Sequence, residues 1–257
     1  MSINQIFIAL STIVIKEITR FSRIWQQTIL PPVITTSLYF VIFGNLIGPR
    51  IGEMEGFRYM DFIVPGLILM SVITNSYANT VSSFFSAKFH HSIEEILVSP
   101  TPNYIILIGY VVGGMSRGIA VGIVVTIVSL MFSDLHIHNI WILSSTVILT
   151  SILFSLGGFI NGVFAKSFDD VSIVPTFVLT PLTYLGGIFY SINLLPQLWQ
   201  NLSLANPILY MINAFRFGFL GISDINLWVS YSIVCLFIVG LFLFNLHLLN
   251  RGYGIRS

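Results

Sequence analysis

Long uninterrupted apolar runs constrain this chain more than any other feature of its sequence. Two of them, Leu67–Ile73 and Ile233–Phe244, contain no charged residue and no strict alternation of apolar and polar positions. A transmembrane β-strand alternates over ~10 residues, so these runs favour helices. Only 8% of the 257 residues are charged, against roughly 25% in a soluble domain, which is too few to cover a water-facing surface. We therefore predict an all-α membrane protein built as a single transmembrane domain over residues 1–257.

The number of membrane spans is limited by the apolar content, which is 55% of the chain. A spanning helix needs about 20 apolar residues, so the chain has room for roughly seven spans at most. The pattern of apolar segments predicts six transmembrane helices, over residues 25–46, 61–87, 104–132, 140–165, 173–190 and 227–249.

The longest connection, residues 191–226, contains a further apolar segment at 207–222. This segment is shorter than the ~20 residues that cross a bilayer, so we predict a re-entrant or interfacial element on the external side. Asn206 followed by Pro207 is typical of a helix N-cap and first turn, and a helix is expected to begin there. A full crossing by this segment would instead give seven spans and move the C-terminus to the other side.

Residues 3–22 have the pattern of an amphipathic helix. Lys16, Thr19, Arg20 and Arg23 fall away from its apolar face, as in helices that lie along a membrane surface. A secretory signal peptide is the alternative, but the apolar stretch has no basic segment before it and no small-residue cleavage site after it. We therefore predict an interfacial helix. Its apolar face consists of Ile3, Ile6, Phe7, Leu10, Val14, Ile18 and Phe21.

The distribution of Lys and Arg predicts the orientation of the six-span arrangement. One side holds seven cations: Lys16, Arg20, Arg23, Lys88, Lys166, Arg251 and Arg256. The other side holds Arg50, Arg58 and Arg216, and Arg117 lies within a span. Cytoplasmic loops carry the excess of Lys and Arg, so both termini are expected in the cytoplasm. A seven-span arrangement would leave equal numbers of Lys and Arg on the two sides of the membrane, so the charge bias favours six spans.

The sequence lacks the common motifs of an enzyme or of a self-powered pump. A P-loop requires Gly-Lys followed by Ser or Thr, and the three lysines follow Ile15, Ala87 and Ala165. No H-E-x-x-H or C-x-x-C motif is present, and Cys235 is the single cysteine. A net charge of +1 provides no basic stripe for nucleic acid. We expect no catalytic residue, no metal ion, no cofactor and no ATP hydrolysis by this chain.

Four residues within the spans are candidates for lining a conduit. Arg117 lies inside the 104–132 span, where an ionisable residue either faces a cavity or a partner, or snorkels toward the headgroups. Pro65 interrupts the 61–87 span, and Pro175 and Pro181 interrupt the 173–190 span. Such breaks are tolerated where a cavity or a neighbouring helix satisfies the backbone, so kinks without a transport role are the alternative.

The loop of residues 88–103 contains a short helix signal. Ser92 and Glu95 match a capping box, and Pro100 and Pro102 are expected to end the helix. The predicted helix carries an apolar face beside two adjacent acids: Ile93, Ile96 and Leu97 against Glu94 and Glu95. It could lie on the bilayer, but paired acids are unfavourable beside an anionic leaflet. A docking surface for a soluble partner is the preferred interpretation.

Several motifs along the whole chain resemble those of the ABC-2 type exporter permeases. They are Pro31–Thr35, Phe43–Gly48, Phe62–Leu67, Ile93–Val98, Asn161–Lys166, Phe168–Asp170 and Val174–Gly187. The resemblance implies a bacterial inner-membrane permease subunit of an ATP-driven exporter, with six spans, an N-terminal membrane-surface helix and an external re-entrant hairpin at 191–226. It further implies a homodimer bound to two copies of a separate ATPase.

In that family the loop after the second span forms the coupling helix that contacts the ATPase, and residues 92–100 match it here. The resemblance does not define the substrate, since related permeases move drugs, polysaccharides or lipid-linked glycans. Two other functions remain open on the residues alone. One is a stand-alone secondary transporter coupled to an ion gradient, and the other is a membrane assembly protein without a conduit.

Overall fold

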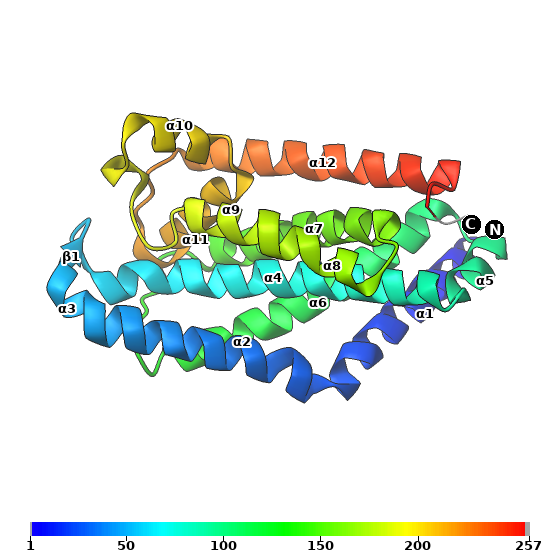
Figure 1. The fold of residues 1–257 in the computed structure, drawn as a ribbon, viewed down its shortest axis with the longest axis horizontal. Coiled ribbons are helices and arrows are strands. Elements are labelled where there is room, and N and C mark those ends of the chain that lie inside the picture. Colours follow the sequence, from blue (N-terminus) through cyan, green and yellow to red (C-terminus); the bar gives the residue numbers. More distant parts are fainter. Residues whose placement is uncertain (1, 255–257) are drawn as a thin grey trace.

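The computed structural model describes residues 2–254, apart from the side chains of Ile96 and Leu97. Its helices lie along one long axis (Figure 1). Within the described residues, five helical segments are long and apolar enough to cross a membrane. They are α2 (Trp25–Tyr39) with its continuation through η1 (Phe40–Ile47) and α3 (Gly48–Ile51), α4 (Tyr59–Phe89), α6 (Asn103–Ser129), α7 (Ile140–Phe164) and α12 (Leu227–Arg251). These segments match five of the predicted spans to within a few residues.

The segment predicted as a span at 173–190 has other limits. Its helix begins at Phe168, because Ser167 and Asp170 form a capping box. It continues through α8 (Phe168–Val174), the π-helical η2 (Pro175–Leu179) and α9 (Thr180–Leu185). It ends before Gly186, and Gly187 takes a φ of +79° that favours glycine. This helical segment is therefore shorter than the five long ones and, like the segment from Trp25 to Ile51, contains a π-helical stretch.

α4 is the central helix of the bundle, buried along most of its length and packed mainly against α6 and α7. Small residues allow this close approach, as in other membrane helix pairs. A methyl group on Gly118 of α6 would meet the side chain of Ser76, and one on Gly158 of α7 would meet the backbone of Tyr77. The glycines of α6 and α7 thus determine which of their faces contact α4.

The N-terminal helix α1 (Ile3–Arg23) confirms the prediction of a helix at 3–22. Its buried residues are Ile13, Glu17 and Phe21, whereas Ile3 and Phe7 of the predicted apolar face are exposed, at 86% and 70%. α1 therefore packs on α6 through a face that contains an acidic residue, and its exposed apolar side chains face away from the bundle.

One end of the bundle is formed by short elements: the hairpin β1 (Glu53–Met54) and β2 (Phe57–Arg58), η3 (Ile192–Leu194), α10 (Gln197–Leu204) and α11 (Pro207–Leu220). Asn206 caps α11 as expected, since its Oδ1 accepts from the backbone N of Ile208 at 3.0 Å. α11 is buried against α4, α7 and α12.

Hydrogen bonds and charge from Asp61, and then from Asp134, raise the pKa of Arg58 in the hairpin above its ordinary value.

The opposite end holds α5 (Ser92–Val98), the start of α1 and the end of α12 (Figure 1). A helix was correctly predicted here and ends before Pro100, but the predicted capping box is wrong. His91 is the N-cap, in a left-handed conformation with a φ of 57°. This tight turn after α4 makes Ser92 already helical, and its hydroxyl donates to the carbonyl of Ala87 at 3.2 Å. It is therefore not placed to cap the amide of Glu95.

Candidate coupling surface and polar clusters

The two acids of α5 are exposed, and its first apolar residue is not. Ile93 is 1% exposed and belongs to the apolar core at this end of the bundle, with Phe84 and Ile106. Glu94 and Glu95 face outward. Ile93 therefore anchors α5 to the spans, and the surface left for a partner consists of His91, Glu94, Glu95 and Val98. We call these four residues the α5 surface. The side chains of Ile96 and Leu97, which the sequence also assigns to coupling, lie outside the described residues.

Two electrostatic contacts hold the α5 surface in place. His91 Nδ1 lies 2.8 Å from Glu94 Oε1, across the first turn of α5. Lys88 Nζ donates to the carbonyls of Val163 and Ala165, at 2.7 and 2.9 Å. Carbonyl groups at a helix C-terminus attract cations, so Lys88 binds the end of α4 to the end of α7.

A cleft lies between α5 and the segment that follows α7. Its volume is about 250 Å³. The residues lining it include Phe85, Lys88, His91, Glu94 and Lys166. The sequence did not predict this cleft, because it forms only where the ends of α4 and α7 meet.

Arg117, the one charge predicted well inside a span, contacts a polar residue of α4. Its Nη2 donates to Asn75 Oδ1 at 3.1 Å. Asn75 in turn donates to the carbonyl of Ser71 at 3.0 Å. Arg20 of α1 makes a similar contact one helical turn along α4, donating to Oδ1 and to the backbone oxygen of Asn79 at 2.8 and 2.9 Å. Arg117 and Arg20 are thus held side by side on one face of α4.

Glu17 is a functional candidate that the sequence analysis missed. It is completely buried, its Oε1 accepts from Ser83 Oγ at 2.6 Å, and its Oε2 lies 3.6 Å from Arg20. The available signal was its spacing of four residues from both Ile13 and Phe21, which places an acid in the middle of a helix stripe that is otherwise apolar.

The three prolines proposed to line a conduit lie apart from Arg117 or on an outer face. Pro65 is buried within α4, ten residues and so roughly 15 Å along the helix from Asn75. Its neighbour Gly66 packs against Ile188. Pro175 is half-buried and Pro181 is exposed. A conduit role for these residues stays a prediction.

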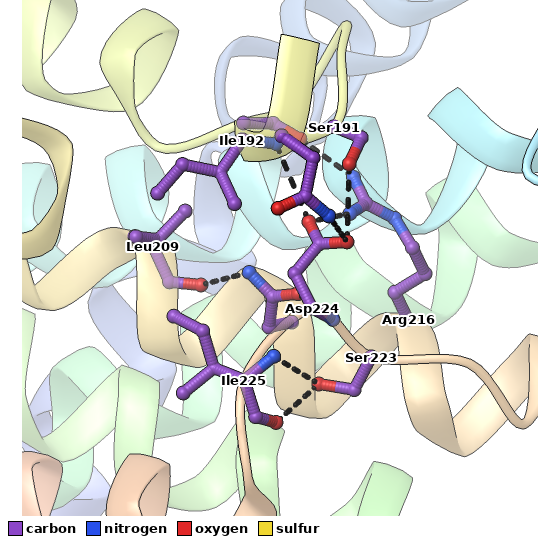
Figure 2. Close-up of polar contacts among 10 residues, drawn as sticks. Ser191, Ile192, Leu209, Arg216, Ser223, Asp224 and Ile225 are labelled. Atoms are coloured by element: carbon purple, nitrogen blue, oxygen red, sulfur yellow. Dashed lines mark hydrogen bonds and ion pairs between the residues drawn. The ribbon is translucent and has the colours of Figure 1, made fainter. Parts of the chain in front are cut away.

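Arg216 lies in a second buried cluster, shown in Figure 2. It is 1% exposed, its Nη2 donates to the carbonyl of Gly187 at 2.6 Å, and its guanidinium lies 3.8 Å from the ring centre of Phe62. Its Nη1 is 4.0 Å from Asp224 Oδ2. Arg216 was predicted only to lie on the side opposite the termini, and nothing in the sequence indicated that α11 would bury its side chain within the bundle.

The carboxylate of Asp224 accepts further hydrogen bonds within this cluster (Figure 2). It accepts from Ser191 Oγ at 3.1 Å and from the backbone N of Ile192 at 3.4 Å. Its own backbone N donates to Asn213 Oδ1 at 2.9 Å. The Arg216–Asp224 cluster therefore ties together the turn after α9, the helix α11 and the loop before α12. Among the described residues, no three His, Cys, Asp or Glu side chains are placed to hold a metal ion.

Comparison with known proteins gives a consistent result over most of the chain. The family described as "ABC-2 type transporter" matches residues 8–220. The chain is similar to the inner membrane transport permease YadH of Escherichia coli, with 60% identity over 251 residues that cover 98% of each chain. YadH of Shigella flexneri shows the same identity and coverage. Nodulation protein J of Rhizobium leguminosarum bv. viciae is 24% identical over 215 residues, 83% of each chain.

Proposed function

The chain belongs to the ABC-2 type transporter family and is a membrane permease subunit of an ABC transporter, and from this premise we propose that a separate ATPase drives it by docking on the α5 surface. The observation that carries the proposal is the form of α5, which presents Glu94 and Glu95 outward while Ile93 is buried in the core of the spans. Force applied to the acids would therefore reach the bundle directly.

The proposal includes six membrane crossings. α7 ends beside Lys88, at the end of the molecule that carries α5. α12 begins at the opposite end, after the loop that contains Asp224 (Figure 1). The chain returns between these ends through α8, η2 and α9, which supports a sixth, bent crossing. α10 and α11 would then form the re-entrant segment on the external side.

An even number of crossings leaves both termini on one side of the membrane. The excess of Lys and Arg on that side supports a cytoplasmic location for the termini and for α5. The relatives named as inner membrane permeases support the bacterial inner membrane as the location of this chain.

We further propose that two copies of the chain pair, each with its own ATPase subunit, to form the conduit between them. The outer face formed by α2 and α9 supports this pairing. The hydroxyls of Tyr39 and Tyr184 are hydrogen-bonded at 3.0 Å on this face, beside the exposed side chains of Leu38 and Phe177. Polar groups on an apolar membrane face favour a protein neighbour over lipid chains.

The test is co-purification of the permease with its candidate ATPase after charge reversal on α5. Glu94→Lys with Glu95→Lys is expected to abolish both ATPase retention and permease-dependent ATP turnover. Glu53→Lys, an exposed acid on the hairpin at the opposite end, is the matched control and should change neither. Unchanged assembly and turnover in the double variant would refute the docking assignment.

The competing function is a secondary transporter coupled to an ion gradient. It predicts uptake by liposomes that contain the purified chain, a proton or sodium gradient, no ATPase and no nucleotide. Such uptake would overturn the proposed mechanism. The ATPase-driven mechanism predicts uptake only when the ATPase and ATP are both present.

A further inference from the structure

The two arginines held along α4 are only partly balanced by acidic residues. Asn79 binds Arg20 and Asn75 binds Arg117, one turn apart on the same face of α4. Within the part of the chain that the structure describes, the only acid in ionic contact with the pair is Glu17, whose nearest oxygen is 3.6 Å from Arg20. Among the described residues, Arg117 forms no ion pair. The pair and its acid therefore carry a net positive charge in a largely buried environment.

Both guanidinium groups also have donors that are not used. The Nε atoms of Arg20 and Arg117 are buried and have no hydrogen-bond partner. A buried donor without a partner costs free energy, and the cost is larger for a charged group. Arginine pairs are well suited to phosphate, because each planar guanidinium presents several donors in a fixed fork.

A groove between α2 and α4 begins at Asn75, the residue that holds Arg117. Its volume is about 250 Å³. Residues that line it are Pro31, Thr35 and Tyr39 of α2, and Met70, Thr74 and Asn75 of α4. The groove thus runs along two helices of the bundle from the residue that binds Arg117, with an apolar lining interrupted by hydroxyl and amide groups, and neither arginine is among its lining residues.

The depth of the arginines in the membrane fits a lipid headgroup. Arg20 lies in the last turn of α1, just before α2 begins its crossing at Trp25. Arg117 is one turn of α4 beyond it, toward the external end. In the proposed orientation the pair is therefore close to the headgroup level of the cytoplasmic leaflet, and the groove extends from there into the hydrocarbon region.

We propose that Arg117 and Arg20 bind the phosphate headgroup of a membrane amphiphile in the cytoplasmic leaflet, with its acyl chain in the groove between α2 and α4. The inference rests on the proposed function, since it defines the class of molecule that the permease receives: a lipid-like compound with an anionic phosphate group. The cationic pair binds the phosphate, and the apolar groove adds affinity for phosphates that carry an acyl chain.

The experiment uses the purified full-length permease in nanodiscs that hold equal amounts of phosphatidic acid and phosphatidylcholine. Native mass spectrometry measures the lipids that remain bound. The wild-type chain should retain phosphatidic acid preferentially, and Arg117→Gln should lower this retention about tenfold, as expected for the loss of one charge-assisted hydrogen bond. Arg117→Lys, which keeps the charge, should retain most of it. Arg23→Gln removes an exposed cation of α1, the helix that carries Arg20, and should have no effect.

Three outcomes would overturn the proposal. They are equal retention of both lipids by the wild-type chain, an equal loss in Arg23→Gln, and displacement of phosphatidic acid by millimolar inorganic phosphate, which would indicate a site for a soluble anion. Binding of the candidate ATPase, added to the same nanodiscs, separates this inference from the proposed function. Arg117→Gln should still bind the added ATPase, whereas a wild-type chain that retains phosphatidic acid but does not bind the added ATPase would refute the proposed function alone.

Discussion

Replacing Arg216 by Met tests whether the buried cluster at the end opposite α5 holds α11 in place. The substitution removes the 2.6 Å hydrogen bond to the carbonyl of Gly187 and the contact with the face of Phe62. A hydrogen bond from a charged donor contributes about 1.5–3 kcal/mol, and a buried cation–π contact about 1–2 kcal/mol. Asp224 keeps its bonds to Ser191 and Ile192, so its carboxylate is not left without donors. We expect a loss of about 3 kcal/mol.

The assay is thermal unfolding of the purified chain in detergent, followed by tryptophan fluorescence. For a protein of this size, a loss of about 3 kcal/mol lowers the Tm by roughly 6–12 °C. Arg50→Met is the matched control, because Arg50 is exposed at the same end. The double variant with Asp224→Asn should add little, since the Arg216–Asp224 separation is 4.0 Å. A Tm for Arg216→Met equal to that of the control would refute the reasoning.

Other predictions concern helix packing and capping. Gly118→Ala should destabilise the chain by about 1–3 kcal/mol, because the methyl group would meet Ser76 of α4. Gly240→Ala should stabilise the chain by roughly 0.5–1 kcal/mol, because a methyl group there would have no neighbouring heavy atom within 4 Å. Melting temperatures that shift in the same direction for Gly118→Ala and Gly240→Ala would contradict both predictions. Lys88→Met should speed amide exchange at residues 163–165, where two hydrogen bonds are lost, and unchanged exchange would show that α4 and α7 are not joined there. Asn206→Ala should cost about 1–2 kcal/mol, measured by the detergent melt, because it removes the N-cap of α11 and the bond to the carbonyl of Leu182.

The helix α5 shows how far local sequence signals reach. The helix at α5 and its end before Pro100 were predicted correctly, since capping residues and prolines act within a few residues of their position. The capping box was wrong because the turn at His91 depends on how α4 ends and where Ala87 lies. The burial of Ile93 likewise depends on residues of α4 and α6 that are distant in sequence.

The buried charges show where such signals fail. Periodicity placed Arg20 on the polar face of the N-terminal helix, and the charge count placed Arg216 on the side opposite the termini without predicting its burial. The structure instead pairs Arg20 with Asn79 of α4, and Arg216 with the carbonyl of Gly187. Neither contact has a sequence signature, because each partner is far along the chain and belongs to a different element.

The sequence by itself determined the membrane class, the helical architecture and the five long segments. A run of about 20 apolar residues forms a helix long enough to cross the hydrocarbon core, whatever its tertiary contacts. It also determined the helix starts at Asn206 and in the N-terminal segment. Only the tertiary structure decided which polar groups meet inside the bundle. In a low-dielectric interior each charge must find a partner, and the packing of α1, α4, α6 and α11 chooses that partner.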